Sequence, residues 1–457
     1  MDASSQKIFL ENFAEISPPL RPEEARIEAN RCLYCYDAPC IQSCPTHINI
    51  PRFIKQIASE NLVGSAKTIL EANALGHSCA RACPVEVLCE GACVYHDWQE
   101  KPIQIARLQR RATDFLHESG AVPFKPGPDN GRRVAVIGAG PAGLSAAAYL
   151  RRLGYPVVIF EKEKVLGGLN TNGIAEYKMN RKVSLDEVKR LFQLGADVKL
   201  GVEVGRDISP ERLLQDFEAI FIGCGLGETQ RLDIPGENLK GVWDALSFIR
   251  LIKEHKLESL GKSATTVVIG AGNTAIDAVT QSKRIGTPKV VMAYRRSAAE
   301  MGAYSFEYDL AKSDGAEFLW NAQPVRILGK NKVEGIEFQR TQIVGKKLKI
   351  VPRSKFTLSC DRVIKAIGQM KSSGLAKAFD LKLEADGRLW VEPATLQSSH
   401  PKIFAGGDAI NGGKEVVNAA ADGKRAAWAM DRFLRPEIPP TPENEYWIST
   451  LETRIAA

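Results

Sequence analysis

The chain of 457 residues has no stretch of about 18 uncharged apolar residues, so the sequence predicts no membrane span. Its first residues, MDASSQKIFLENFAEISPPL, lack a basic segment followed by an apolar run, which argues against a signal peptide. The net charge of +7 is spread along the chain without any long run of Lys or Arg, and no nucleic-acid recognition motif is present. We therefore expect a cytoplasmic protein that binds neither membrane nor nucleic acid.

Cysteine is scarce over most of the chain. Beyond residue 93 only Cys224 and Cys360 occur, and their isolation excludes a redox-active C-x-x-C pair there. We predict that both are buried thiols without a redox role. The other eight of the ten cysteines lie between Cys32 and Cys93, and in a cytosolic chain such a cluster favours metal binding over disulfides.

The N-terminal part of the chain is predicted to be helical. We expect a short helix over residues 22–30, helical periodicity over 51–75, and a helix over 102–119 with proline in its first turn. Residues 122–131 (VPFKPGPDNG) are a linker by composition. Beyond the linker the pattern changes to strand–glycine–helix–strand units, which indicates an α/β fold.

The first of these units carries the motif G-x-G-x-x-G. In VAVIGAGPAGL, Gly138 permits a tight turn, Gly140 lets the backbone approach a pyrophosphate, and Gly143 allows close helix–strand packing. The next strand ends in Glu161, whose carboxylate can bind a ribose 2′-OH. This context predicts a dinucleotide site; the alternative is a glycine-rich turn without a ligand.

The second unit, VVIGAGNTAIDAV, has Gly270, Gly272 and Ala275 in the G-x-G-x-x-A variant. The position that matches the acidic ribose ligand holds Arg295, followed by Arg296. An arginine there can pair with a 2′-phosphate, which favours NADPH over NADH. The alternative is that the two arginines are ordinary surface charges.

Two such units in tandem resemble the two-dinucleotide-binding flavoprotein superfamily, whose first domain holds FAD and whose inserted second domain holds NAD(P)H. AGGDA (405–409) resembles the stretch with the flavin-ribityl aspartate, and GGLN (167–170) resembles a second flavin-contacting loop. We expect strands over 355–368 to return to the first domain. The resemblance implies FAD contacts at Gly138, Ala139, Gly140, Pro141, Ala142, Gly143, Glu161, Gly168, Leu169, Lys178, Gly407 and Asp408. It implies NAD(P)H contacts at Gly270, Gly272, Asn273, Thr274, Arg295, Arg296 and Gly368. No catalytic side chain is expected, because hydride transfer takes place between cofactors.

The cysteine-rich region has two runs with different spacing. They read C-x2-C-x4-C-x3-C-P at positions 32, 35, 40 and 44, and C-x3-C-P-x4-C-x3-C at positions 79, 83, 89 and 93. Local triplets completed by a remote fourth ligand are typical of iron–sulfur clusters. Zinc sites more often use two C-x2-C knuckles, and the chain has only one, so the spacing favours iron–sulfur clusters over zinc. Zinc binding and disulfides are the alternatives.

This module followed by tandem nucleotide domains resembles the small (β) subunit of bacterial glutamate synthase and the N-terminal half of dihydropyrimidine dehydrogenase, which in bacteria is a separate flavoprotein subunit. The wording of CLYCYDAPCIQSCPTHINIPRFI and NALGHSCARACP is closer to the second. The resemblance implies two interleaved [4Fe-4S] sites. One is held by Cys32, Cys35, Cys40 and Cys93, and the other by Cys44, Cys83, Cys89 and Gln109.

The eighth ligand has an alternative. Gln109 shares the apolar stripe of its predicted helix, where a buried amide needs a partner. If it only caps a neighbouring backbone group, Cys79 completes the second site. In the mammalian type of this family a second arginine helps to bind the 2′-phosphate. Gly302 stands at that position here, so NADH remains an alternative to NADPH.

The resemblance implies that the chain is the flavoprotein subunit of a dihydropyrimidine dehydrogenase. It would oxidise NAD(P)H through FAD and two [4Fe-4S] clusters and feed a partner that carries FMN and reduces uracil or thymine. The resemblance implies that the two subunits form a heterotetramer. The alternatives are the glutamate synthase small subunit and a non-catalytic cluster-binding subunit. The expected domains are 1–121 (helical iron–sulfur), 131–240 (FAD, first part), 241–355 (NAD(P)H), 356–440 (FAD, second part) and 441–457 (surface tail).

Overall fold

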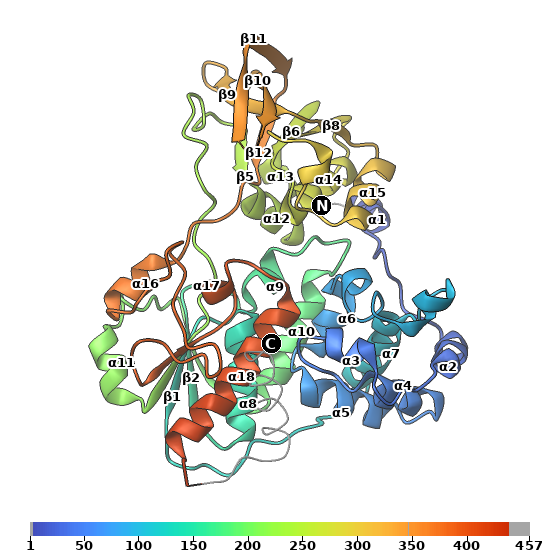
Figure 1. Ribbon diagram of the computed structural model, residues 1–457, viewed down its shortest axis with the longest axis vertical. Helices are drawn as coiled ribbons and strands as arrows, with labels where there is room; N and C mark the ends of the chain where they lie inside the picture. The colour runs from blue at the N-terminus through green and yellow to red at the C-terminus, as the bar shows by residue number, and fades with distance from the viewer. Residues whose placement is uncertain (1–2, 346, 438–457) are drawn as a thin grey trace. The chain divides into compact units, whose positions relative to one another are not determined.

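The computed structural model describes residues 3–345 and 347–437, which form two compact units (Figure 1). Unit 1 comprises Met1–Ile16, Asn172–Arg181 and Gly227–Met370, and unit 2 comprises Ser17–Thr171, Lys182–Leu226 and Lys371–Ala457. The expected surface tail, 441–457, lies outside the described residues. Within the described ranges, no helix is long and apolar enough to cross a membrane.

The N-terminal part of unit 2 is helical, as predicted. Its elements are α2 (Pro22–Arg31), α3 (Pro39–Ser43), α4 (Ile50–Ala58), α5 (Leu62–Ala72), α6 (Gly76–Ala82), η1 (Val85–Val87), η2 (Val94–Trp98) and α7 (Ile105–Ser119). We call this part the helical domain. Asn49 and Asn61 cap α4 and α5 by accepting hydrogen bonds from backbone N–H groups of the first turn. The last helix begins at Ile105, so the expectation that proline lies in its first turn is wrong.

The core of the helical domain is formed by one face of each longer helix. Phe53 and Ile54 of α4, Ile69 of α5, and Leu108 and Leu116 of α7 are wholly buried in a single cluster. Cys44 and Cys79 belong to the same cluster. The packing therefore sets the cysteine runs directly on the apolar core.

The rest of unit 2 is the expected first dinucleotide domain, which we call the flavin domain. Its elements are β1 (Val134–Ile137), α8 (Pro141–Arg152), β2 (Val157–Glu161), α9 (Gly168–Asn172), α10 (Arg181–Phe192), β3 (Asp197–Leu200), α11 (Pro210–Asp216), β4 (Ala219–Ile222), α16 (Ser373–Ala378), β13 (Ile403–Ala405), α17 (Asp408–Asn411) and α18 (Val416–Leu434). The strands form a parallel sheet in the order β13-β4-β1-β2-β3. Alternate residues of β1 belong to different apolar clusters on the two faces of this sheet, Val134 and Val136 on one and Ala135 and Ile137 on the other.

Unit 1 contains the second dinucleotide fold. Its elements are α1 (Ala3–Asn12), β5 (Val242–Asp244), α12 (Ala245–Lys253), α13 (Leu257–Leu260), β6 (Thr265–Ile269), α14 (Asn273–Arg284), β7 (Lys289–Ala293), η3 (Ala298–Glu300), α15 (Ser305–Ser313), β8 (Glu317–Leu319), β9 (Ala322–Leu328), β10 (Gly335–Val344), β11 (Lys347–Ser359) and β12 (Arg362–Lys365). A parallel sheet has the order β5-β12-β6-β7-β8, and an antiparallel sheet has the order β11-β10-β9. Val268 packs with the helices, whereas Val267 and Ile269 pack with Ile336 and Phe338 of the antiparallel sheet.

Two expectations about domain boundaries are wrong. Residues 355–368 do not return to the flavin domain, because β12 pairs on both sides within unit 1, with β5 and β6. The first 16 residues do not belong with the helical domain, because Phe9 and Phe13 of the N-terminal segment are buried against Phe248 and Ile252 of unit 1.

Candidate functional site

The first glycine-rich turn has the geometry of a pyrophosphate site. It connects β1 to α8, and Gly140 is the residue before the helix. A Cβ added at Gly143 would lie 1.9 Å from the carbonyl oxygen of Gly138, so only glycine permits this close packing. By contrast, a Cβ at Gly140 would meet no atom within 4 Å, which leaves open space in front of the helix N-terminus for an anionic ligand.

The other predicted FAD residues except Lys178 lie in unit 2, the unit of this turn. Glu161 is buried at the end of β2, where its carboxylate accepts hydrogen bonds from the N–H groups of Ala139 (2.7 Å) and Glu163 (2.8 Å). The N–H of Gly167 donates to the carbonyl of Ala139 at 2.9 Å, which ties GGLN to the turn. Asp408 lies at the start of α17, and burial raises the pKa of its carboxyl group. Pro141 and Ala142 begin α8, Gly168 and Leu169 begin α9, and Gly407 directly precedes α17.

The second glycine-rich turn, in unit 1, repeats this design. A Cβ at Gly270 would lie 2.2 Å from the carbonyl oxygen of Ala366, whereas a Cβ at Gly272 would meet no atom within 4 Å. Asn273 begins α14 and accepts a hydrogen bond from the N–H of Tyr304 at 3.1 Å, and Thr274 is exposed beside it. The structure therefore leaves a second open helix N-terminus that suits a phosphate.

The arginines beside the second turn differ in environment. Arg295 is exposed, whereas Arg296 is half-buried, and its Nε is a buried donor without a hydrogen-bond partner among the described residues. A buried unpaired donor is costly unless a ligand satisfies it. The environment of Arg296 therefore favours a role in binding an anionic group over the alternative of an ordinary surface charge. Gly368 has a positive φ of 96° in the loop after β12 of the same unit.

Lys178 lies in a buried network of unit 1. Its Nζ is 2.8 Å from Asp277 and 2.6 Å from Glu307, and these carboxylates help to hold its pKa well above the usual value despite burial. Tyr177 donates to Asp277 at 2.9 Å in the same network. The contact of Lys178 with FAD stays a prediction.

The first predicted group of cysteines converges on one cavity. Cys32, Cys35, Cys40 and Cys93 all line it, together with apolar side chains that include Ile54. Burial and the neighbouring thiols of Cys32, Cys93 and Cys35 raise the pKa of Cys40 to about 12. These four residues come from both cysteine runs, and their grouping agrees with the interleaved assignment.

The second group lies close by. Burial and the thiol of Cys44 contribute to a pKa of Cys89 well above the usual value, and a hydrogen bond with Cys79 has the largest part in the raised pKa of Cys83. Gln109 is buried, and its Nε2 donates to the carbonyl of Gly76 at 2.6 Å, which leaves the amide oxygen for another partner. Cys79 therefore contacts a cysteine of the second group, whereas the hydrogen bond of Gln109 is to a backbone carbonyl, as the capping alternative expects. The choice of the eighth ligand stays a prediction.

Helix ends position many of these cysteines. Cys32, Cys44 and Cys83 directly follow α2, α3 and α6 in extended conformation, and Cys93 directly precedes η2. All ten cysteines are free thiols, and no three His, Cys, Asp or Glu side chains among the described residues are grouped as around a single metal ion. Burial raises the pKa of Cys224 to about 11 and that of Cys360 to about 12, which fits thiols that stay protonated.

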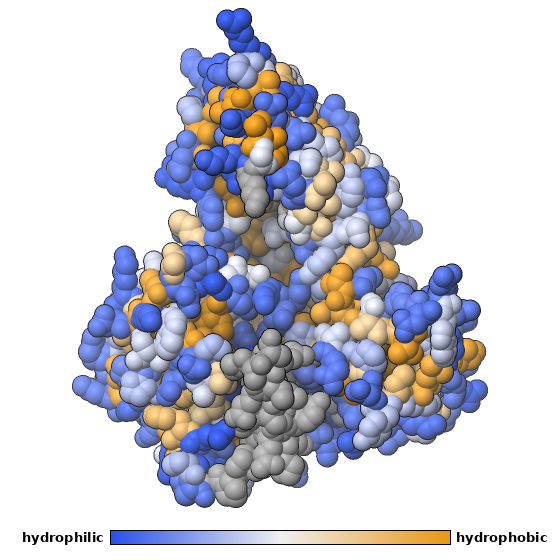
Figure 2. Space-filling view, viewed as in Figure 1, coloured by the Kyte–Doolittle hydropathy of each residue, from blue (hydrophilic) through white to orange (hydrophobic). Residues whose placement is uncertain are grey.

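Part of the first cysteine run lies at the surface. The side chains of Leu33 and Tyr36 are exposed, and apolar surface is visible over the helical domain in Figure 2. The four cysteines that line the cavity of the first group are only half-buried. The second group, by contrast, combines half-buried Cys83 and Cys89 with buried Cys44.

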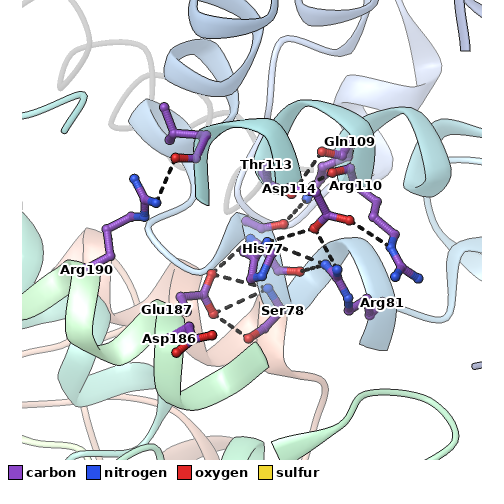
Figure 3. A network of polar contacts seen from close by, with 12 residues as sticks. His77, Ser78, Arg81, Gln109, Arg110, Thr113, Asp114, Asp186, Glu187 and Arg190 are labelled. Carbon is purple, nitrogen blue, oxygen red and sulfur yellow. Dashed lines mark hydrogen bonds and ion pairs between the residues drawn. The ribbon is translucent and has the colours of Figure 1, made fainter. Parts of the chain in front are cut away.

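A buried polar network connects the helical domain to the flavin domain within unit 2 (Figure 3). Glu187 of α10 is 2% exposed and accepts hydrogen bonds from the N–H of His77 (2.9 Å), the N–H of Ser78 (3.2 Å) and the hydroxyl of Ser78. The Nδ2 of Asn170, in the GGLN loop, donates to the hydroxyl of Ser78 at 2.8 Å. The network thus joins a predicted flavin loop to α6, the helix of Cys79.

One turn farther along α10, Arg190 donates to the carbonyls of Leu116 (3.0 Å) and Ala121 (2.6 Å) at the end of α7. A cation at a helix C-terminus interacts favourably with the unpaired carbonyls. Sequence reasoning missed both Glu187 and Arg190. The signal available was their spacing of three residues, which puts two opposite charges on one face of a helix.

Comparison with known sequences agrees with this geometry. Residues 132–423 match the family described as pyridine nucleotide-disulphide oxidoreductase, and residues 9–121 match the dihydropyrimidine dehydrogenase domain II, 4Fe-4S cluster. The chain belongs to the pyridine nucleotide-disulphide oxidoreductase family, as an FAD- and NAD(P)-dependent oxidoreductase with a 4Fe-4S domain.

Two kinds of relative match equally well. The chain is 34% identical to the glutamate synthase [NADPH] small chain of Escherichia coli K12, over 94% of this chain and 95% of that one. It is also 34% identical to the NAD-dependent dihydropyrimidine dehydrogenase subunit PreT of Salmonella typhimurium LT2, over 92% of this chain and 97% of that one. Among solved structures, Mycobacterium tuberculosis FprA in complex with NADPH shares the fold with a TM-score of 0.55 and 18% identity, covering 71% of this chain and 90% of that one.

We predict that Glu187 makes stability depend on pH. Burial raises the pKa of Glu187 to about 7 against its hydrogen bonds, whereas an unfolded glutamate titrates near the ordinary value of 4.5. Between these two pKa values the folded protein keeps a proton that the unfolded chain has lost. The free energy of unfolding is therefore greatest below the lower pKa and falls as pH rises towards the upper one. E187Q removes this loss, which is on the order of 3 kcal/mol. The difference in thermal midpoint between E187Q and the wild type should therefore increase from pH 5 to pH 8.

The control is D186N on the same helix. Lys182 and Lys189 lower the pKa of Asp186 although burial opposes them, so this carboxylate does not titrate in that range. D186N should follow the pH profile of the wild type. An E187Q profile parallel to that of the wild type would contradict the prediction.

Proposed function

We propose that the chain is the electron-transferring flavoprotein subunit of a two-subunit dihydropyrimidine dehydrogenase, which oxidises NAD(P)H and supplies electrons to a partner that reduces uracil or thymine. The observation that carries the electron-transfer part is the division of the cysteines into two groups in the same unit as the first glycine-rich turn. This division supplies four thiols for one cluster and at least three for the other, in the same unit as the predicted flavin site.

The proposal assigns the side chains as follows. Cys32, Cys35, Cys40 and Cys93 hold one [4Fe-4S] cluster, and Cys44, Cys83, Cys89 and either Gln109 or Cys79 hold the other. The open N-terminus of α8 binds the pyrophosphate of FAD, Glu161 its ribose, and Asp408 its ribityl chain. When bound, FAD accepts a hydride from NAD(P)H, and the clusters carry electrons singly.

The chain's own contribution is to bind, orient and exclude water. Gly140 and Gly272 leave room for two pyrophosphates, and hydride transfer between the cofactors needs no acid or base from the chain. All ten cysteines are free thiols, as cluster ligands must be, and the proposed location in the reducing cytoplasm would maintain that state. The half-buried first group of cysteines supports electron exit to a partner at that surface.

The pyrimidine-reducing partner is supported by the likeness to PreT and by the match of residues 9–121 to a dihydropyrimidine dehydrogenase domain. A second candidate, the small subunit of glutamate synthase, is supported by the equal identity to the Escherichia coli small chain. Both candidates share the electron path and differ in the acceptor subunit.

The test uses the full chain purified without oxygen. We expect about eight irons per chain on the assignment of two four-iron clusters, one FAD, NAD(P)H oxidation with an artificial electron acceptor, and no reduction of uracil by the chain alone. Adding a pyrimidine-reducing FMN subunit should make NAD(P)H oxidation depend on uracil. Oxidation that instead depends on glutamine, with a glutamate synthase large subunit, would favour the second candidate. Reduction of uracil by the chain alone would sink the subunit assignment.

The eighth cluster ligand can be tested by iron content. We expect Q109A to lose about four irons and C79A to retain all of them, since Gln109 rather than Cys79 matches the implied ligand set. The measurement is iron and acid-labile sulfide per chain, with flavin content as the control for folding. Loss of four irons from C79A, with Q109A unaffected, would reverse the assignment.

Arg296 should discriminate between the nucleotides. Its buried, unpaired Nε can donate to a 2′-phosphate, which NADH lacks. R296Q should therefore lower kcat/KM for NADPH about tenfold or more and change kcat/KM for NADH little, because a hydrogen bond to a charged group contributes about 1.5–3 kcal/mol. The matched control is R295Q, at the exposed neighbouring position. Equal losses with both nucleotides in R296Q would contradict the role of Arg296.

A further inference from the structure

Lys424 is a buried cation at the junction of the helical and flavin domains. It lies on α18, and its side chain is fully buried. The Nζ donates to the carbonyl of Thr46 at 2.8 Å and to that of Ala72 at 2.7 Å. Both acceptors belong to the helical domain, so α18 of the flavin domain places a positive charge inside the other domain.

The surroundings of Lys424 explain why a charged side chain is held there. Ala72 is the last residue of α5, where carbonyl oxygens lack partners within the helix and carry partial negative charge. The ring of Trp428 lies 5.2 Å from the Nζ and that of Tyr149 lies 6.0 Å away. Oxygen dipoles and aromatic rings both stabilise an ammonium group away from water.

Thr46 connects this charge to a cysteine. It is completely buried, and its Oγ1 lies 3.4 Å from the Sγ of Cys44. A thiolate bound to iron has no proton to donate, so with a cluster in place the hydroxyl of Thr46 must be the donor. The same residue thus accepts a hydrogen bond from Lys424 at its carbonyl and offers one to a ligand sulfur at its hydroxyl.

We propose that Thr46 and Lys424 raise the reduction potential of the cluster held by Cys44. A hydrogen bond to a ligand sulfur and a buried positive charge both stabilise the reduced cluster, which carries one more negative charge than the oxidised one. The effect is strong because few water molecules screen the charge in a buried site. The inference rests on the proposed function, since it requires that Cys44 ligate a cluster.

The test is an equilibrium redox titration of the anaerobically purified holoprotein, followed by low-temperature electron paramagnetic resonance. T46V removes the hydroxyl at constant shape, and T46S retains it. K424Q removes the charge, and K424R retains it. We expect T46V and K424Q each to lower the ratio of reduced to oxidised Cys44 cluster about tenfold at a fixed potential, which for one electron corresponds to a shift of 59 mV. T46S and K424R should remain near the wild type.

The signal that shifts must be the one that C83A abolishes and C35A retains, because Cys83 and Cys44 belong to the same proposed group and Cys35 to the other. Unchanged potentials in T46V and K424Q, with all iron retained, would overturn the inference and leave the proposed function intact. Absence of iron–sulfur signals from the wild-type protein would instead overturn the proposed function. If K424Q loses iron, the comparison of T46V with T46S decides the matter alone.

Discussion

The arrangement of unit 2 depends on two buried polar side chains that form hydrogen bonds with main-chain groups of a neighbouring domain. Glu187 accepts hydrogen bonds from N–H groups at the start of α6, and Lys424 donates to carbonyls of the helical domain. A buried charge is costly unless hydrogen bonds compensate for it. Since each of these side chains lies on the flavin domain and its partners lie on the helical domain, neither forms its hydrogen bonds unless both domains are folded and in contact. The two domains therefore pack together as parts of unit 2, an arrangement that would keep the proposed clusters beside the proposed flavin site.

The cysteine runs impose a second mutual dependence. α3 has five residues and α6 has seven, and helices so short are unstable by themselves in water. They are held by packing against α4, α5 and α7, and they end at Cys44 and Cys83. Each proposed cluster takes ligands from both runs, so the metal would join segments that the apolar core has already brought together. Core packing and cluster binding thus support the same arrangement of the chain.

The sequence predicted the elements whose pattern is local. The two glycine-rich turns, the helices that surround the cysteines and the linker all follow from spacing within short segments. The errors concern where a correctly predicted element packs. β12 is a buried apolar strand, as expected, but apolarity alone does not say whether Ile364 faces the sheet of unit 1 or that of the flavin domain. The same holds for Phe9 and Phe13. Glu187 and Lys424 escaped notice for the opposite reason, because Glu and Lys are normally exposed and a helical pattern assigns them to the surface. The alanine-rich surroundings of Lys424 in NAAADGKRAAWAM, which let helices approach closely, were the available hint.

The two glycine-rich turns show how one fold supports different ligands. Gly140 and Gly272 occupy equivalent places before α8 and α14, and at each the backbone leaves open space for a phosphate. The strand that follows each turn ends differently, in the buried carboxylate of Glu161 or beside the guanidinium group of Arg296. The carboxylate of Glu161 already accepts hydrogen bonds from two backbone N–H groups, whereas the Nε of Arg296 is an unpaired donor among the described residues. A buried donor without a partner costs free energy in the absence of a ligand, and an anionic ligand recovers that cost on binding. On the proposed assignment, the backbone of each turn accommodates a pyrophosphate, and the charge at the strand end selects the dinucleotide.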